Sequence, residues 1–357
     1  MTSKFQFNEY RLLGKSGLRV SPLCLGAMTF GDSSGWSAGK DEARKLFLRY
    51  KEAGGNFIDT ADLYMGGQSE EWIGEFIQET KARDWFVITT KFSFNAEPGN
   101  PNAGGQGRKN ITRALEGSLR RLKTDRIDVY CLHAWDLVTP VEEVIETLNN
   151  LVRQGKILHL AMSNVPAWYA SRAQTIAQLR GWEPLAMMQL EYSLVSRSLE
   201  REHLPLAIET GISICPWSPL ASGFLTGKYK RTEQGISGEG RIQVVKDSGN
   251  PTMEKFAKTP RNWVILDALQ QASREMGKRP VELALNWVAN RRGVASTLIG
   301  ATRIEQLEAN LASLNFVIPE ELSRRLDEAS RPEPTELDHF FGPVMQSMIH
   351  GGTRLAT

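Results

Sequence analysis

The sequence has few cysteines, no long apolar run and no large excess of charge, and each absence excludes a class of protein. Its 357 residues hold three cysteines, Cys24, Cys131 and Cys215, without the spacing of a disulfide framework or a zinc site. All three lie in apolar runs, so we expect them to be buried. No apolar run approaches the about 18 residues of a membrane span, and residues 1–10 lack a signal-peptide core. With 43 basic and 41 acidic residues, charge gives no reason to expect a nucleic-acid or membrane partner. A cytoplasmic enzyme is the expectation that remains.

The glycine-rich fingerprint of a dinucleotide-binding open sheet is also missing. Residues 25–31, after the first long apolar run, have glycines five apart and no G-x-G-x-x-G. Apolar runs then alternate with helical patterns, and continuous apolar runs are typical of parallel strands covered on both faces. Eight such runs begin near Leu23, Phe57, Phe86, Ile127, Ile157, Ala186, Ile212 and Ser296. This pattern predicts an α/β chain folded as a (β/α)8 TIM barrel, and it favours the barrel over a doubly wound sheet.

The remaining segments fit one barrel domain over residues 1–357 with added pieces. Residues 10–14 and 18–21 flank a Lys-Ser-Gly turn and predict an N-terminal β-hairpin. Thr139-Pro140-Val141-Glu142 predicts a capping box at a helix start. Residues 218–260 form a long loop after the seventh strand, as functional loops at the C-terminal face often do. From about residue 331 the tail is irregular and rich in Pro and Gly, and we expect either a loop over the barrel mouth or a frayed end.

Three successive predicted strands end in residues that transfer or stabilise protons. Asp59, Lys91 and His133 stand at these ends, and Tyr64 follows the first of them by five positions. In a barrel of this type the carboxyl ends of the strands carry the active site. A lysine ammonium favours the phenolate and should strengthen Tyr64 as an acid, and Asp59 would hold that lysine. A neutral His133 could hydrogen-bond a substrate oxygen. The set is suited to protonating a carbonyl oxygen.

Each of these residues taken alone has a simpler interpretation. An aspartate after a strand is usually a cap, a lysine there is usually a solvated charge, and a histidine beside aromatic residues is usually packed. Their occurrence at three consecutive strand ends favours the functional interpretation.

Further motifs make the chain similar to the aldo-keto reductase superfamily. Asp59-Thr60-Ala61-Asp62-Leu63-Tyr64, Thr90-Lys91 and Leu132-His133 resemble its Asp–Tyr–Lys–His tetrad. Ser163-Asn164, Gln189, the run from Pro216 to Gly223, the run from Leu225 to Tyr229 and the run from Ile299 to Asn310 then follow in the expected order. The likeness covers roughly residues 10–329. Within the superfamily, the Trp-Ser-Pro-Leu segment most resembles the branch of bacterial aryl-alcohol-dehydrogenase-like reductases and potassium-channel β subunits.

The resemblance implies an NADP(H)-dependent reductase of aldehydes or ketones. Tyr64 would donate the proton, Lys91 and Asp59 would tune it, and His133 would orient a small-molecule carbonyl substrate, so that Tyr64 and His133 also bind substrate. The resemblance implies that the cofactor-binding residues are Met28, Asp59, Ser163, Asn164, Gln189, Trp217, Ser218, Pro219, Leu220, Ser222, Lys228, Gly300, Thr302, Arg303, Gln306 and Asn310. Among them, Trp217 would stack on the nicotinamide, and Thr302 and Arg303 would bind the 2′-phosphate. No metal is implied.

Some features leave alternatives open. Ala309 stands where many relatives have an acidic residue, which removes one expected adenosine contact. A regulatory subunit that binds NADPH, like the channel β subunits, is the second hypothesis, and the presence of His133 favours a working reductase. A carboxylate-dependent hydrolase would have to use Asp59 and Glu191. Phe30, Trp36, Phe92 and Trp135 suggest an aryl-tolerant pocket. Family members range from monomers to octamers, so oligomerisation is possible.

Overall fold

Eight parallel strands form the centre of the molecule. The computed structural model describes residues 7–32, 35–232, 235–247 and 251–353. The strands pair in the order β12-β3-β4-β5-β6-β7-β8-β9. They are β3 (Leu23–Gly26), β4 (Phe57–Asp59), β5 (Val87–Phe92), β6 (Ile127–Leu132), β7 (Ile157–Ser163), β8 (Leu185–Glu191), β9 (Ser213–Trp217) and β12 (Thr297–Ile299). A parallel bridge between Ile214 and Val294 joins β9 to the segment before β12 and closes the barrel. The predicted TIM barrel is confirmed.

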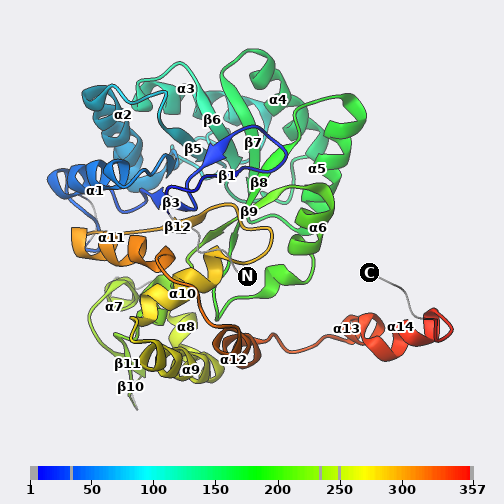
Figure 1. Ribbon diagram of the computed structural model, residues 1–357. Helices are drawn as coiled ribbons and strands as arrows, with labels where there is room; N and C mark the ends of the chain where they lie inside the picture. The colour runs from blue at the N-terminus through cyan, green and yellow to red at the C-terminus, as the bar shows by residue number, and fades with distance from the viewer. Residues whose placement is uncertain (1–6, 33–34, 233–234, 248–250, 354–357) are drawn as a thin grey trace.

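Helices surround this barrel (Figure 1). They are α1 (Lys40–Glu52), α2 (Gln68–Thr80), α3 (Arg108–Leu122), α4 (Val141–Arg153), α5 (Ala167–Arg180), α6 (His203–Thr210), α9 (Pro260–Met276), α10 (Pro280–Ala289), α11 (Ile304–Leu311) and α12 (Glu320–Ser330). In α4 the buried residues include Val144, Ile145 and Leu148, which share one face because the helix repeats every 3.6 residues. Short 3-10 turns lie at η1 (Tyr64–Gly67), η2 (Ser198–Glu200), η3 (Ala221–Thr226), η4 (Pro251–Glu254) and η5 (Ala312–Leu314).

The predicted capping box at α4 is wrong. Pro140 is the N-cap and makes no side-chain cap bond. Thr139 instead donates its hydroxyl to Asp136 Oδ2 at 2.6 Å. Asp136 also accepts the backbone amides of Val138 and Thr139, so a local turn takes the hydroxyl that the helix would have used.

The predicted hairpin closes the N-terminal end of the barrel. β1 (Arg11–Leu12) pairs antiparallel with β2 (Arg19–Val20). Between them, Leu13 is fully buried, and the amide of Gly14 donates to Ser213 Oγ at the start of β9. Leu13 and Val20 join the apolar cluster inside the barrel. The same cluster contains all three cysteines, so their predicted burial is confirmed.

Two segments depart from the β–α alternation. The long loop after β9 contains a small antiparallel pair, β10 (Lys230–Thr232) and β11 (Gly235–Ser237), and the short helices α7 (Arg241–Asp247) and α8 (Lys255–Lys258). The tail is helical where we expected it to be irregular, with α13 (Glu336–Phe341) and α14 (Pro343–Ile349). In Figure 1 these two helices lie apart from the barrel, beyond α12. No helix in the described ranges is both long and apolar enough to cross a membrane.

Candidate active site

The three residues at the predicted strand ends and Tyr64 meet at the C-terminal end of the barrel. Asp59 is the last residue of β4, Lys91 lies near the end of β5, and His133 follows β6. Asp59 is in register with Thr89, and Lys91 with Cys131. Because side chains alternate along a strand, Asp59, Lys91 and His133 continue the inward-facing rows that begin deeper in the barrel. Tyr64 reaches them from η1, so the structure brings together all four predicted residues.

Lys91 is the centre of this group. Its side chain is fully buried, and each proton of its ammonium has an acceptor. Nζ donates to Asp59 Oδ1 at 2.5 Å, to the backbone oxygen of Thr60 at 2.8 Å and to the Tyr64 hydroxyl at 3.1 Å. Burial alone would lower the pKa of Lys91, but the charge of Asp59, and that of Tyr64 once it ionises, outweigh burial and raise it. The lysine is therefore an ammonium ion.

The acidity of Tyr64 differs from the sequence-based expectation. Burial raises the pKa of the phenol, and the nearby Lys91 ammonium only partly offsets this rise. The effect of Lys91 has the predicted direction, but burial, which the sequence did not show, outweighs it. The result is a phenol that stays protonated at neutral pH, which a proton donor requires. Lys91 still makes this phenol a better acid than the same buried phenol would be without a cation.

His133 lies beside the phenol. Its Nε2 is 3.4 Å from the Tyr64 hydroxyl, and the ring of Phe94 meets its ring edge to face at 4.9 Å. Burial, and then the charge of Lys91, lower the pKa of His133 to about 3, so the imidazole is neutral. Its buried Nδ1 has no hydrogen-bond partner in the described part of the chain. A bare lone pair there costs less than an unpaired N–H, so we assign the proton to Nε2, where the N–H can donate a hydrogen bond to a substrate oxygen.

The neutral state of His133 predicts a pH effect on stability. Its folded pKa lies below the unfolded value of about 6.5, so the unfolded chain binds the extra proton between these two values. Stability should therefore fall with acid, by up to about 1.4 kcal/mol per pH unit over that window. Urea unfolding from pH 7 to pH 4 should show a smaller loss in His133→Gln than in the wild type. Asp62, whose pKa burial and Glu70 raise to about 7, acts oppositely but equally in both proteins.

The exposed His339 supplies the control. His339→Gln should follow the wild-type profile. Parallel profiles for wild type and His133→Gln would contradict a buried neutral histidine.

A group of amide and hydroxyl side chains lies on the next strand ends. Ser163 ends β7, Gln189 lies in β8, and Trp217 ends β9. Asn164 donates to the backbone oxygen of His133 at 2.9 Å and to Ser163 Oγ at 3.0 Å, and it accepts from Trp217 Nε1 at 3.2 Å. Gln189 Nε2 donates to Asp59 Oδ2 at 2.7 Å. These bonds fix the ring of Trp217 and leave the carbonyl oxygen of Gln189 available to a ligand amide.

The loop after β9 has two serines in the left-handed region of backbone space. Ser218 and Ser222 have positive φ angles of 54° and 56°, and the amide of Ser222 donates to Ser218 Oγ at 3.2 Å. Pro219 is buried, and Leu220 packs partly buried against the core. The ammonium of Lys228 lies near Gly223 of this loop, close to where a Cβ would be.

The segment after β12 is organised by two side chains of α11. Gln306 Oε1 accepts the amide of Thr302 at 2.8 Å, and the buried Asn310 donates to the backbone oxygen of Gly300 at 3.2 Å. Gln306 and Asn310 therefore stabilise this segment and are not merely a solvated face of the helix. The first amide of α11 already donates to Glu42 Oε1 at 3.2 Å. An anion here would rely on side-chain cations more than on free helix amides.

The structure adds a cation that sequence reasoning missed. Arg241, on α7, stacks on the ring of Trp36 at 4.3 Å, and its Nη2 lies 3.8 Å from Met28 Sδ. Burial lowers its pKa to about 10, and the charge of Tyr64 acts in the opposite direction. Only the position of Arg241 in a long Gly-rich loop was visible in the sequence, and that position does not show which element it contacts.

Arg241, Lys228 and Arg303 share one property. None of the three forms an ion pair with an acid in the described residues. Loss of hydration and then the charge of Arg303 lower the pKa of Lys228, which indicates a region of positive potential. Such a region favours a polyanionic ligand.

The aromatic residues divide into core and rim. Phe30 and Phe92 are fully buried and belong to the core, so they do not line a substrate site. Trp135 packs against Trp168 with ring centres 5.4 Å apart. Phe94 and Trp168 remain about half exposed on the same end of the barrel as His133. Phe94 was missed because the pattern of buried strands does not extend into the loop that holds it.

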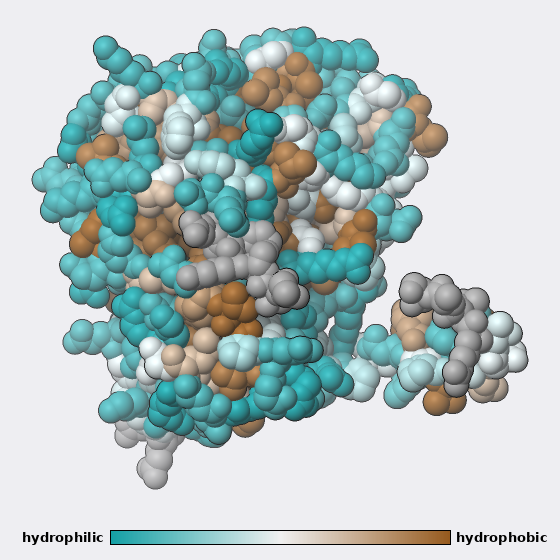
Figure 2. All heavy atoms as spheres, viewed as in Figure 1, coloured by the Kyte–Doolittle hydropathy of each residue, from teal (hydrophilic) through white to brown (hydrophobic). Residues whose placement is uncertain are grey.

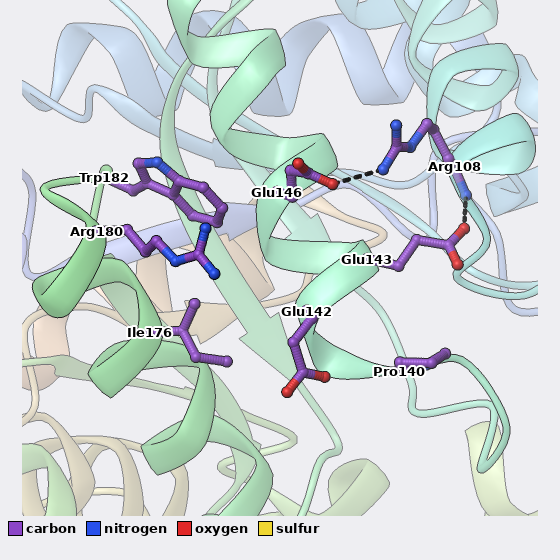
Figure 3. A pocket seen from close by; sticks show the side chains of 8 residues that line it. All are labelled: Arg108, Pro140, Glu142, Glu143, Glu146, Ile176, Arg180 and Trp182. Atoms are coloured by element: carbon purple, nitrogen blue, oxygen red, sulfur yellow. Dashed lines mark hydrogen bonds and ion pairs between the residues drawn. The ribbon is translucent and has the colours of Figure 1, made fainter.

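The pocket in Figure 3 lies elsewhere. It has a volume of about 580 Å³ and lies on the outside of the barrel, lined mainly by α4 and α5. Its glutamates are already engaged, since Glu146 pairs with Arg108 at 2.7 Å and Glu143 accepts the amide of Arg108 at 2.8 Å.

Glu191 at the barrel end pairs with Lys255 at 2.9 Å. The described residues contain no group of three or more His, Cys, Asp or Glu side chains placed to hold a metal.

Comparison with known proteins agrees with the family resemblance seen in the sequence. Residues 22–331 match the model of the aldo/keto reductase family. The chain belongs to the aldo/keto reductase family. Norsolorinic acid reductase of Aspergillus flavus is 33% identical over 90% of this chain and 80% of its own length. The aryl-alcohol dehydrogenase [NADP(+)] of Phanerodontia chrysosporium is 32% identical over 87% of this chain and 83% of its own. An aryl-alcohol dehydrogenase of Pestalotiopsis microspora is 34% identical over 89% and 81%.

Membership of the aldo/keto reductase family supports an oxidoreductase that acts on carbonyl groups with a nicotinamide cofactor. The predicted family is confirmed, as is its resemblance to aryl-alcohol dehydrogenases. The relatives named here are fungal.

Proposed function

We propose that this protein reduces an aldehyde or ketone to an alcohol with NADPH, and that Tyr64 donates the proton. The observation that carries the proposal is the contact of one buried ammonium, Lys91, with both Asp59 and Tyr64, with His133 beside the phenol. A carbonyl oxygen placed between Tyr64 and His133 Nε2 would have two donors as negative charge builds on it. The direct test is carbonyl-dependent oxidation of NADPH by the purified protein.

The residues fit the proposed cofactor at both of its ends. Trp217, Ser163, Asn164 and Gln189 offer a flat ring and amide partners for the nicotinamide. Lys228, Arg241 and Arg303, which have no acidic partner among the described residues, offer cations for its phosphates. When bound, NADPH supplies a hydride to the carbonyl carbon.

The protein's own residues do the remaining work. Tyr64 transfers its hydroxyl proton to the carbonyl oxygen, and Lys91 stabilises the phenolate that this leaves. Asp59 holds Lys91 in place, while Gln189 holds the second oxygen of Asp59. His133, being neutral, orients the carbonyl without competing as a proton donor.

An aryl carbonyl is the substrate class that we propose. The half-exposed rings of Phe94 and Trp168 offer apolar surface near His133. Two of the relatives named above are aryl-alcohol dehydrogenases. The alternative, a regulatory subunit that binds NADPH without turnover, would predict binding and no product.

Arg303 should set the preference for NADPH over NADH. It is exposed at the N-cap of α11 and has no acidic partner among the described residues. A hydrogen bond to a charged group is worth about 1.5–3 kcal/mol, so Arg303→Ala should weaken NADPH binding about tenfold or more and NADH binding little. Fluorescence titration with both cofactors measures this. Arg292→Ala, at another exposed arginine, is the control, and equal losses for both cofactors in Arg303→Ala would remove Arg303 from a 2′-phosphate site.

A further inference from the structure

The helical tail displays an unusual amount of apolar surface for its size. Six large apolar side chains of α13 and α14 are between 55% and 73% exposed, namely Leu337, Phe340, Phe341, Val344, Met348 and Ile349. In Figure 2 the tail appears as a separate lobe with brown apolar spheres, clear of the barrel. Large exposed apolar patches on soluble proteins usually mark interaction sites.

The tail nevertheless has defined secondary structure, held by local hydrogen bonds. Asp338 Oδ2 accepts from both the amide and the hydroxyl of Thr335, which forms a capping box at the start of α13. Gln346 Nε2 donates to the backbone oxygen of Phe340 at 3.0 Å, which ties α14 to α13. Neither helix has a buried residue. Helices of six and seven residues are too short to be stable in water alone, so this pair of helices needs a surface to pack on.

The point where the tail leaves the barrel is fixed. Arg261 on α9 donates to the backbone oxygen of Arg331, and Arg201 donates to that of Glu333. The charge of Arg201 also contributes to lowering the pKa of Asp338, after the hydrogen bonds from Thr335. These contacts hold the first residues of the tail against the barrel while α13 and α14 extend away from it (Figure 1). The apolar surface is thus presented outward.

We propose that α13 and α14 form a dimerisation surface whose partner is the same surface of a second copy of this chain. Six side chains of this kind expose on the order of 400–700 Å² per copy, from about 60–120 Å² each. A two-fold pairing would bury about twice that area, which reaches the size of specific interfaces. In a two-fold interface the same patch of each copy covers that of the other, so the chain needs no second, complementary surface.

Charge is compatible with this pairing. α13 and α14 contain two acidic residues, Glu336 and Asp338, both in the first turn of α13, and no lysine or arginine. Asp338 is already occupied by the capping box. Two copies can therefore approach without repulsion between like charges at the centre of the interface. The inference is independent of the proposed reductase activity.

The test is the mass of the full-length chain in solution, measured by light scattering across a dilution series. The wild type should have about twice the chain mass of 39.9 kDa and dissociate on dilution. The double variant Phe341→Glu/Met348→Glu should have the mass of one chain. The control Leu179→Glu/Val264→Glu adds the same charges at exposed apolar positions on α5 and α9, and should remain a dimer.

Several outcomes would overturn the proposal. A monomeric wild type would do so, as would a tail variant that remains a dimer. Amide exchange in the wild type gives a second readout, because protection of α13 and α14 should rise with protein concentration. Protection that is independent of concentration would mean that the tail packs on its own barrel. A wild type that is monomeric until lipid vesicles are added would assign the surface to membranes.

Discussion

Tyr64→Phe should lose about 10²- to 10⁴-fold in carbonyl reduction, the range that a positioned general acid contributes. The phenylalanine keeps the ring beside His133 but removes the hydroxyl that accepts from Lys91. No other hydroxyl is hydrogen-bonded to Lys91 among the described residues, so nothing replaces the lost proton. Because Tyr64 is not required to bind phosphates or the nicotinamide amide, NADPH affinity should be nearly unchanged.

Steady-state rates and a fluorescence titration of the same preparation separate these two effects. Tyr10→Phe is the matched control, since Tyr10 is exposed and its hydroxyl bonds only to the backbone oxygen of Gly54 in the described structure. This control should keep the wild-type rate. A Tyr64→Phe enzyme that turned over at the wild-type rate would exclude Tyr64 as the donor.

Lys91→Met should lower both the stability of the fold and the rate of carbonyl reduction. It leaves the buried carboxylate of Asp59 without its cation, and breaking one partner of a buried pair costs about 3–5 kcal/mol of stability. It also removes the charge that stabilises the phenolate of Tyr64, so the rate should fall by at least about 10².

A double variant distinguishes the two losses. In Asp59→Asn/Lys91→Met the uncompensated charge is gone, so urea unfolding should show much of the stability restored, with a coupling of about 1–3 kcal/mol. Activity should stay lost, because the ammonium beside Tyr64 is still absent. Recovery of activity along with stability would mean that Lys91 acts only by holding the fold.

The barrel and its central group of residues could be predicted because both depend on local pattern. Continuous apolar runs predict buried parallel strands, and strand ends in a barrel meet at one rim. Asp59, Lys91 and His133 could therefore be placed together from their positions alone. Their contacts with one another follow from strand register, which the buried pattern also determines.

Other features depend on tertiary contacts that leave no local signal. Arg241 reaches Met28 and Trp36 because Tyr229 accepts the amide of Ile242 and helps hold α7 in place. The rise in the pKa of Tyr64 depends on burial that a loop sequence does not reveal. Thr139 satisfied a capping pattern, but Asp136 competed for its hydroxyl.

The most direct test of the central claim is steady-state oxidation of NADPH by the purified full-length protein with a panel of aryl aldehydes and ketones. We predict oxidation that depends on the carbonyl compound, with one alcohol formed for each NADPH consumed, and loss of this rate in Tyr64→Phe. Tight binding of NADPH with no carbonyl-dependent oxidation across the panel would contradict the claim and support a regulatory, cofactor-binding role.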